Sequence, residues 1–146
     1  MCYFKAHELV PPSVYKQYGE KSFRFIDEKI LNILSFLRDY YKSPILINNY
    51  VYSGNLKNRG LRLEGLPFFK KYSCHSFGRA VDINVKGVPS DMLWEAVTGI
   101  LSDDLKTLGL TAVESKEDTP TWTHLSVSNF KGWDIPEING IKILKG

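Results

Sequence analysis

One short stretch decides how this sequence is interpreted: SCHSFGRAVD, residues 73–82. Residues 80–85 alternate between apolar and polar side chains, which predicts a strand with Asp82 on its polar face. His75 lies in the loop that leads into this strand, and the intervening Gly78 allows the backbone to turn sharply. An imidazole and a carboxylate brought together in this way suit a divalent metal ion that needs one or two further ligands.

A third ligand is available on a later predicted strand, residues 122–128, which carries His124. Three protein ligands and one position open to water form a catalytic zinc site, whereas structural zinc sites are closed by four ligands, usually including cysteine. Zinc lowers the pKa of its water to about 7, which makes that water a nucleophile. We therefore predict a zinc centre at His75, Asp82 and His124, although manganese or iron could use the same ligands.

The remaining pattern predicts an α+β fold with a small, mainly antiparallel sheet and helices packed on one face. Apolar residues recur every three or four positions in residues 22–41, which predicts a helix that ends at residues 42–44. The further elements are expected in this order: a strand at 45–47, a long functional loop at 48–73, a helix at 90–100 and a hairpin of residues 111–114 and 122–128. Residues 1–146 are expected to form one domain, with an irregular N-terminal segment at 1–20 and an extended surface tail at 131–146.

The composition fits a folded protein of 146 residues, because hydrophobic residues make up 43% and charged residues 24%. The net charge of +3 is too small, and the basic residues are too scattered, to predict binding to nucleic acid. No run approaches the roughly 20 apolar residues that cross a bilayer, so no membrane partner is expected. The N-terminal residues do not resemble a secretory signal, so we expect synthesis in the cytoplasm without a signal peptide. We also expect a monomer.

Four other residues receive structural interpretations. A disulfide between Cys2 and Cys74 is conceivable but not favoured in a chain long enough to bury its own core. Cys74 could also be a thiolate nucleophile or a metal ligand, although its apolar, tightly spaced setting favours a packed residue. His7 lies in the irregular N-terminal segment and is expected at the surface or as a cap. Trp94 is expected in the core.

The stretch at residues 73–82 resembles the signature of a known family of zinc peptidases. The pattern Ser-x-His-x-x-Gly-x-Ala-x-Asp is matched at every fixed position, by Ser73, His75, Gly78, Ala80 and Asp82. It is similar to that of the zinc D-alanyl-D-alanine carboxypeptidases and their relatives, which include phage L-alanyl-D-glutamate endolysins, murein endopeptidases and the hedgehog signalling domain. The aromatic-flanked His of that family is matched by Trp122 and His124. The resemblance covers residues 20–128 and implies a hedgehog/DD-peptidase-like fold.

The resemblance also implies roles for residues outside the metal ligands. The family has an Arg in a loop upstream of the motif that contacts the substrate near the scissile bond. Arg62, which follows Gly60-Leu61, stands at the matching place, and Arg59 is the second choice. Ser73 is expected to position the site or the substrate. It lacks the His-Asp partners, in suitable order, of a triad nucleophile.

Two positions depart from the family pattern. Many relatives have an acidic general base three positions before the last His ligand, where this chain has Thr121. Glu114, Glu117 and Asp118 lie just before it, and Glu114 is favoured because it closes a predicted strand and begins a Glu-Ser-Lys run like that of hedgehog domains. Several relatives also have an acidic residue two positions after the last His, where this chain has Ser126. Support for His124 from its neighbours is therefore expected to be weaker.

By this resemblance the expected function is zinc-dependent hydrolysis of a peptide bond in the peptidoglycan stem peptide. The implied activity is that of a D,D-carboxypeptidase or an L-Ala-D-Glu endopeptidase. The chain would be encoded by a phage or prophage and would reach the cell wall through host lysis, as an endolysin, or as part of a virion. Thr121 favours an alternative, a non-catalytic zinc-bearing binding or virion structural domain. A third possibility is a peptidase for another small peptide, such as a D-Ala-D-Ala dipeptide.

Overall fold

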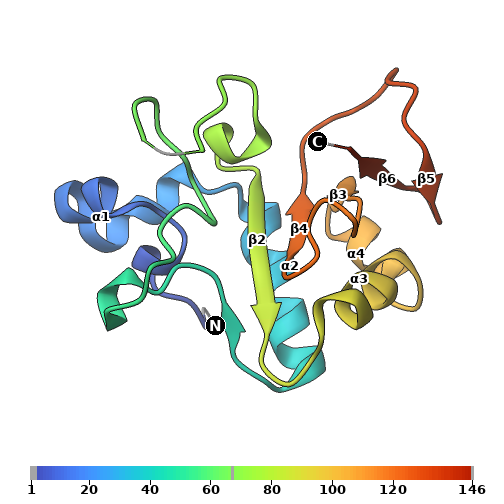
Figure 1. Ribbon diagram of the computed structural model, residues 1–146, viewed down its shortest axis with the longest axis horizontal. Helices are drawn as coiled ribbons and strands as arrows, with labels where there is room; N and C mark the ends of the chain where they lie inside the picture. Colours follow the sequence, from blue (N-terminus) through green and yellow to red (C-terminus); the bar gives the residue numbers. More distant parts are fainter. Residues whose placement is uncertain (1–2, 67, 146) are drawn as a thin grey trace.

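The computed structural model describes residues 3–66 and 68–145, which form an α+β fold built on one six-stranded sheet (Figure 1). The strands follow the order β1-β2-β4-β3-β6-β5. Each neighbouring pair is antiparallel except β3 and β6, which run parallel, so the sheet is mixed but mostly antiparallel. The bounds of the strands are Ile45–Leu46 (β1), Ala80–Val85 (β2), Ala112–Glu114 (β3), Thr123–Ser126 (β4), Glu137–Ile138 (β5) and Ile141–Leu144 (β6).

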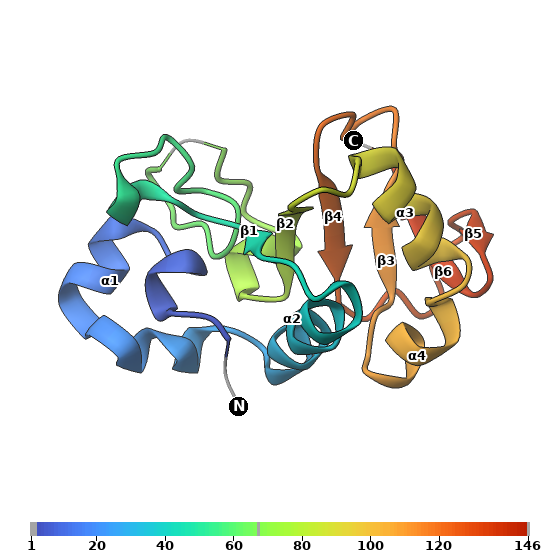
Figure 2. The ribbon, with the colours of Figure 1, turned by 90° about the horizontal axis from the view of Figure 1, so that it is seen from below.

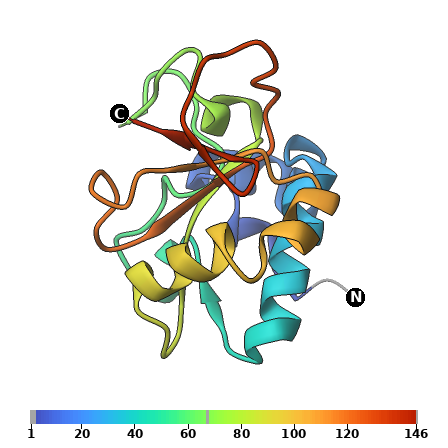
Figure 3. The same cartoon turned by 90° about the vertical axis from the view of Figure 1, so that its right-hand side faces the viewer.

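Helices α2, α3 and α4 lie together on one side of the sheet, whereas α1 lies at the far end of the molecule, against η1 and η2 (Figures 2 and 3). The α-helices of the described residues are Pro12–Tyr18 (α1), Glu28–Tyr41 (α2), Ser90–Thr98 (α3) and Ser102–Thr107 (α4). Short 3-10 helices occupy Ala6–Glu8 (η1), Gly19–Phe25 (η2), Tyr50–Tyr52 (η3) and Cys74–Phe77 (η4). In the described part of the chain, no helix combines the length and the apolar character that crossing a bilayer requires.

The two central strands separate a core face from a site face. Val81 and Ile83 of β2 and Leu125 of β4 are fully buried in the apolar core. Because successive residues of a strand point to opposite faces, Asp82 and His124 point away from that core. They are paired with each other across the β2–β4 ladder. Burial of each large aliphatic side chain contributes about 1.5–3 kcal/mol relative to exposure, so the packed face holds in place the strands that carry the polar pair.

Helix α2 begins later than the predicted residue 22. The chain up to Phe25 forms η2, and the Asp27 side chain then accepts a hydrogen bond of 2.9 Å from the Lys29 N–H. A carboxylate in this position satisfies a free N–H of the first turn, so the helix starts at Glu28. The predicted end is confirmed, because Lys42 follows the helix in a left-handed conformation with φ 51°.

The predicted surface tail at 131–146 is wrong for residues 141–144, which belong to the sheet and are partly buried, whereas residues 131–134 and 136–140 are exposed. Strand β6 pairs with β3, and Ile141 and Ile143 are buried. Asn139 and Gly140 both have positive φ and form the tight turn between β5 and β6, a common hairpin signal. The alternation in residues 141–144 is too short to identify a strand without its partner. The sequence pattern also misses α4, whose six residues are too few for a clear helical repeat.

The N-terminal segment is more ordered than the irregular chain predicted for residues 1–20. Its described part contains η1 and α1, and Leu9 and Val10 are buried in the core. His7 is only 6% exposed, so the expected surface position is wrong. Its ring lies 5.4–6.4 Å, centroid to centroid, from three tyrosine rings, those of Tyr15, Tyr50 and Tyr52. Leu9 and Val10 pack against the core of the domain, a contact between distant parts of the chain that periodicity alone does not reveal.

Of the two cysteines, Cys74 lies within the described residues and Cys2 does not. Cys74 is a free cysteine within η4. Cys2 lies outside the described residues, and with it the disulfide alternative.

Candidate metal centre

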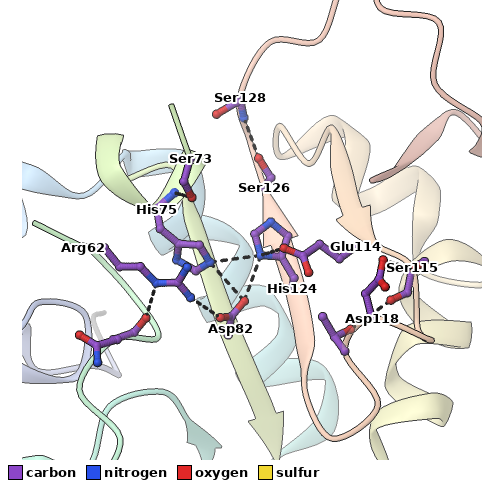
Figure 4. Close-up of polar contacts among 12 residues, drawn as sticks. Arg62, Ser73, His75, Asp82, Glu114, Ser115, Asp118, His124, Ser126 and Ser128 are labelled. Carbon is purple, nitrogen blue, oxygen red and sulfur yellow. Dashed lines mark hydrogen bonds and ion pairs between the residues drawn. The ribbon is translucent and has the colours of Figure 1, made fainter. Parts of the chain in front are cut away.

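The three predicted metal ligands converge on one point at the site face of the sheet (Figure 4). Asp82 Oδ1 lies 3.0 Å from His124 Nδ1 and 3.3 Å from His75 Nε2. The two imidazole nitrogens are 3.2 Å apart. All three side chains are buried, with residue exposures of 2% for His75, 5% for Asp82 and 3% for His124. Residues separated by up to 49 positions in the chain thus share one buried group.

The spacing of these atoms fits a divalent ion. Four-coordinate bonds of about 2.0–2.2 Å at tetrahedral angles place ligand atoms roughly 3.3–3.5 Å from one another. The three observed separations, 3.0–3.3 Å, are slightly shorter than those of such a polyhedron. His75 Nδ1 lies 2.9 Å from the carbonyl oxygen of Gly60, which can only accept, so Nδ1 carries the proton and Nε2 presents a lone pair. This lone pair and the Asp82 carboxylate meet at one point, so the group can hold a metal ion.

His75 is placed by a short, capped turn. The Ser73 hydroxyl oxygen accepts a hydrogen bond of 3.2 Å from the His75 N–H and thereby caps η4. Gly78 then reverses the chain with φ 68°, and a Cβ there would lie 1.9 Å from the carbonyl oxygen of Phe25. Only glycine fits this position. Ser73 therefore positions a ligand through the backbone, and Gly78 brings the turn against the chain that precedes α2.

Asp82 is held from both its backbone and its side chain. Its N–H donates to the carbonyl oxygen of Arg59 at 2.8 Å, and Oδ2 accepts from Arg62 Nη2 at 3.0 Å. Burial by itself would raise the pKa of Asp82, but the neighbouring His124 and His75 side chains hold that pKa well below its ordinary value. Burial lowers the pKa of His75, against the opposing effect of Asp82. The centre therefore combines an ionised carboxylate with a neutral imidazole, the protonation states that metal binding requires.

Arg62 reaches the centre with its side chain, whereas its alternative, Arg59, bonds to Asp82 through the backbone. The Arg62 Nε donates to the carbonyl oxygen of Asn58 at 2.7 Å. The Arg62 backbone N–H donates to the carbonyl oxygen of His75 at 3.1 Å. Burial lowers the pKa of Arg62, and the nearby Asp82 and Glu114 oppose this shift. The side chain is thus fixed next to the metal ligands on the side away from Glu114 (Figure 4).

Of the three candidate general bases, the structure brings Glu114 to the centre. Glu114 Oε1 lies 3.5 Å from His124 Nδ1, at the end of β3. The backbone carbonyl of Glu114 accepts a hydrogen bond of 2.8 Å from Trp94 Nε1. Glu117 is exposed, and Asp118 Oδ2 instead accepts from the Ser115 hydroxyl at 2.7 Å. Trp94 is 7% exposed, which confirms its predicted place in the core. Its indole N–H also holds the end of the strand that carries the Glu114 carboxylate.

The ring nitrogen of His124 that does not face the other ligands lacks the hydrogen bond that the corresponding nitrogen of His75 has. His124 Nε2 is buried and has no hydrogen-bond partner among the described residues. The Ser126 hydroxyl oxygen accepts from the Ser128 N–H at 3.3 Å and so is directed along the strand. Thr121 is exposed, and its carbonyl oxygen accepts from Asn84 Nδ2 at 2.7 Å. Neither position that departs from the family pattern therefore contributes an acid to the centre.

Two cavities adjoin the metal ligands. One, of about 350 Å³, is lined by Asp82, Arg59 and Arg62, and the other, of about 260 Å³, is lined by His124 and Glu114. A substrate could therefore reach the ligand group from two directions. Sequence reasoning does not identify two supporting residues. The Gly60 carbonyl oxygen holds the His75 ring, and the Asn48 side-chain oxygen holds the Arg59 backbone N–H. No pattern in the chain marks contacts of this kind.

Comparisons with known proteins found no match: no family model, no curated protein and no solved structure is similar to this chain. The residues of the centre and their geometry are therefore the basis for its function.

Proposed function

We propose that the chain is a zinc-dependent peptidase that cuts a peptide bond in the stem peptide of bacterial peptidoglycan. The observation that carries this proposal is the buried His75-Asp82-His124 group with Glu114 beside it, 3.5 Å from a ligand nitrogen. Three ligands leave one position of a tetrahedral ion for water or substrate, which is typical of catalytic rather than structural zinc. We assign the fold to the hedgehog/DD-peptidase type on the motif at residues 73–82.

Each residue near the ligands has a definite task in this proposal. Zinc held by the three ligands supplies Lewis-acid chemistry, which polarises the peptide carbonyl and acidifies water. Glu114 accepts a proton from the attacking water and returns it to the leaving amine. Arg62 holds the substrate beside the ligands, and its charge also stabilises the ionised form of Asp82. The substrate is placed across two cavities, with Glu114 lining one of them and Arg62 the other.

The biological setting follows from the same proposal. A stem-peptide bond is cut either at its D-Ala end, by a D,D-carboxypeptidase, or between L-Ala and D-Glu, by an endopeptidase. We propose a phage or prophage protein that meets the wall during host lysis or as a component of the virion.

A non-catalytic zinc-bearing module is the second candidate. It is favoured by Thr121, which stands where many members of the resembling family have their general base and which carries no titratable group. Glu114 argues against it, because a carboxylate within 3.5 Å of a ligand atom can take over the role of the base.

Digestion of purified peptidoglycan separates the two candidates. Purified protein is incubated with sacculi in the presence of zinc or of a chelator, and the released muropeptides are identified by mass spectrometry. We expect zinc-dependent products whose masses identify the bond that is cut. Glu114→Gln should keep stoichiometric zinc and lower the rate by about 10²–10⁴-fold. Zinc binding without any product in the wild type would support the non-catalytic module, and full activity in Glu114→Gln would refute the assigned base.

A further inference from the structure

We propose that Arg59 and Arg62 together form a subsite for a carboxylate of the ligand, next to the metal centre. That the carboxylate belongs to a peptide substrate rests on the proposed function, whereas the anion subsite itself does not. Arg62 is the arginine expected to contact the substrate, and Arg59 is the residue newly assigned. The subsite lies in the cavity of about 350 Å³ that Asp82 also lines.

Arg59 lines this cavity and has an unused hydrogen-bond donor. Its Nη1 is buried and has no partner among the described residues. Burial lowers the pKa of Arg59, and Asp82 opposes the shift, but a guanidinium remains charged in proteins. A buried charged donor without a partner is costly. An anionic oxygen in the cavity would remove that cost.

The backbone around Arg59 is fixed before any ligand binds. The Arg59 N–H donates to Asn48 Oδ1 at 3.0 Å, and its carbonyl accepts from Asp82 at 2.8 Å. The next residue, Gly60, packs so closely that a Cβ would lie 2.2 Å from the carbonyl oxygen of Leu9. The Leu61 N–H donates to that same oxygen at 2.8 Å. Both arginines therefore project from a segment that is already ordered, which reduces the entropy lost on binding.

The charge of the cavity selects an anion. Lys57, Arg59 and Arg62 contribute three positive charges, and Asp82 contributes the negative charge among the residues that line it. The Asp82 carboxylate already contacts Arg62 and both ligand imidazoles, and it forms no ion pair with Arg59 among the described residues. The planar guanidinium forks match a carboxylate, which they can bind with two parallel hydrogen bonds.

The neighbours of the arginines favour a peptide carboxylate over an inorganic anion. Trp122 and Phe68 line the same cavity and offer apolar surface to the carbon atoms that carry the carboxylate. In the stem peptide, a free carboxylate stands beside either proposed bond: on the terminal D-Ala for a carboxypeptidase, and on D-Glu for an L-Ala-D-Glu endopeptidase. The same subsite thus serves both reaction types.

Binding of small probes tests the subsite without relying on peptidase activity. The probes are N-acetyl-D-alanine, its uncharged amide N-acetyl-D-alaninamide, and inorganic phosphate, each titrated into zinc-loaded protein while the indole N–H signal of Trp122 is followed by NMR. We expect the acid to bind at least about tenfold more tightly than the amide. Arg59→Gln should remove this preference, and Arg59→Lys should restore part of it. Arg24→Gln, a change in an exposed arginine outside this cavity, serves as the matched control and should keep the preference.

Three results would overturn the inference: equal affinity for acid and amide, a full preference in folded Arg59→Gln, or phosphate binding as tight as that of the acid. Thermal melting of each variant checks that it is folded. Because the probes are not cleaved, an intact preference in a protein that never cuts peptidoglycan would refute the proposed function and leave the subsite standing.

Discussion

His75 and His124 present one nitrogen each to the same point, but the chain places them by different means. His75 lies in a 3-10 turn, where Ser73 caps its N–H, Gly60 accepts from its ring and Arg62 donates to its carbonyl. His124 lies within β4 and is paired with Asp82 across the ladder. A ligand on a loop needs specific local contacts, whereas a ligand on a buried strand takes its position from the sheet.

This difference predicts where the centre is vulnerable. Changes around His75 should alter the turn and with it the metal affinity, because each contact fixes one part of a short loop. Changes to the side chains around His124 should matter less, because its Nε2 has no hydrogen-bond partner among the described residues. Substitutions on the two sides test this contrast, from the largest expected effect to the smallest.

Removal of either imidazole should abolish stoichiometric zinc binding. In His75→Ala and His124→Ala, two protein ligands remain, too few for a stable catalytic site. Zinc content after dialysis, measured by mass spectrometry of the metal, should fall from one per chain to a small fraction in both variants. If one variant kept full zinc, the two nitrogens would not share an ion.

Gly78→Ala should destabilise the turn that carries His75. Its φ of 68° is unfavourable for alanine, and its Cβ would lie 1.9 Å from a backbone oxygen. We expect a loss of roughly 2–5 kcal/mol in the free energy of unfolding, from backbone strain together with overpacking. Gly87→Ala is the matched control, because Gly87 has φ 81° but no atom lies within 4 Å of the place that its methyl group would take. It should lose only about 1–2 kcal/mol in urea unfolding.

A larger loss in Gly87→Ala than in Gly78→Ala would contradict the close contact between Gly78 and Phe25.

Ser73→Ala and Ser126→Ala form a direct test of the contrast between the two ligands. Ser73→Ala removes the cap of η4, which should cost about 0.5–2 kcal/mol of stability and weaken zinc binding by about tenfold or more. Ser126→Ala removes an acceptor for the Ser128 N–H but no hydrogen bond to His124 among the described residues, so its zinc affinity should stay within about twofold of the wild type. Competition with a chromogenic chelator measures both. Equal weakening in the two variants would mean that the ligands are supported alike.

Trp94→Phe should give the smallest effect on the centre. It removes the hydrogen bond to the Glu114 carbonyl but keeps an aromatic ring in the core. The stability should fall by about 0.5–1.5 kcal/mol for the bond, with a further contribution from the smaller ring. Zinc content should be unchanged, while the rate on peptidoglycan decreases, because the strand end that carries Glu114 is less firmly held. Loss of zinc in this variant would place Trp94 in support of the ligands themselves.

The parts of the fold that sequence reasoning predicts are those with a local signal. Strand β2 has the predicted bounds because its six residues alternate clearly and follow a glycine turn. The end of α2 is marked by Lys42-Ser43-Pro44, but its start depends on the Asp27 cap and on η2, which have weaker signals. Strand β6 and the buried N-terminal segment depend on contacts with distant parts of the chain, which no local pattern encodes.

The same distinction holds for the candidate site. The spacing of residues 73–82 indicates His75 and Asp82, and the sequence also suggests His124, Glu114 and Arg62. What it cannot indicate is the support around them, such as the Gly60 carbonyl, the Asn48 amide and the Trp94 indole, because these contacts arise only when the loop packs on the sheet.

X-ray absorption spectroscopy of the zinc-loaded protein, combined with its metal content, tests the shared ion most directly. We predict one zinc per chain, with two imidazole nitrogens and a carboxylate oxygen at about 2.0–2.2 Å and no sulfur ligand. A zinc content far below one per chain, or a sulfur at about 2.3 Å from Cys74, would contradict a centre built from His75, Asp82 and His124.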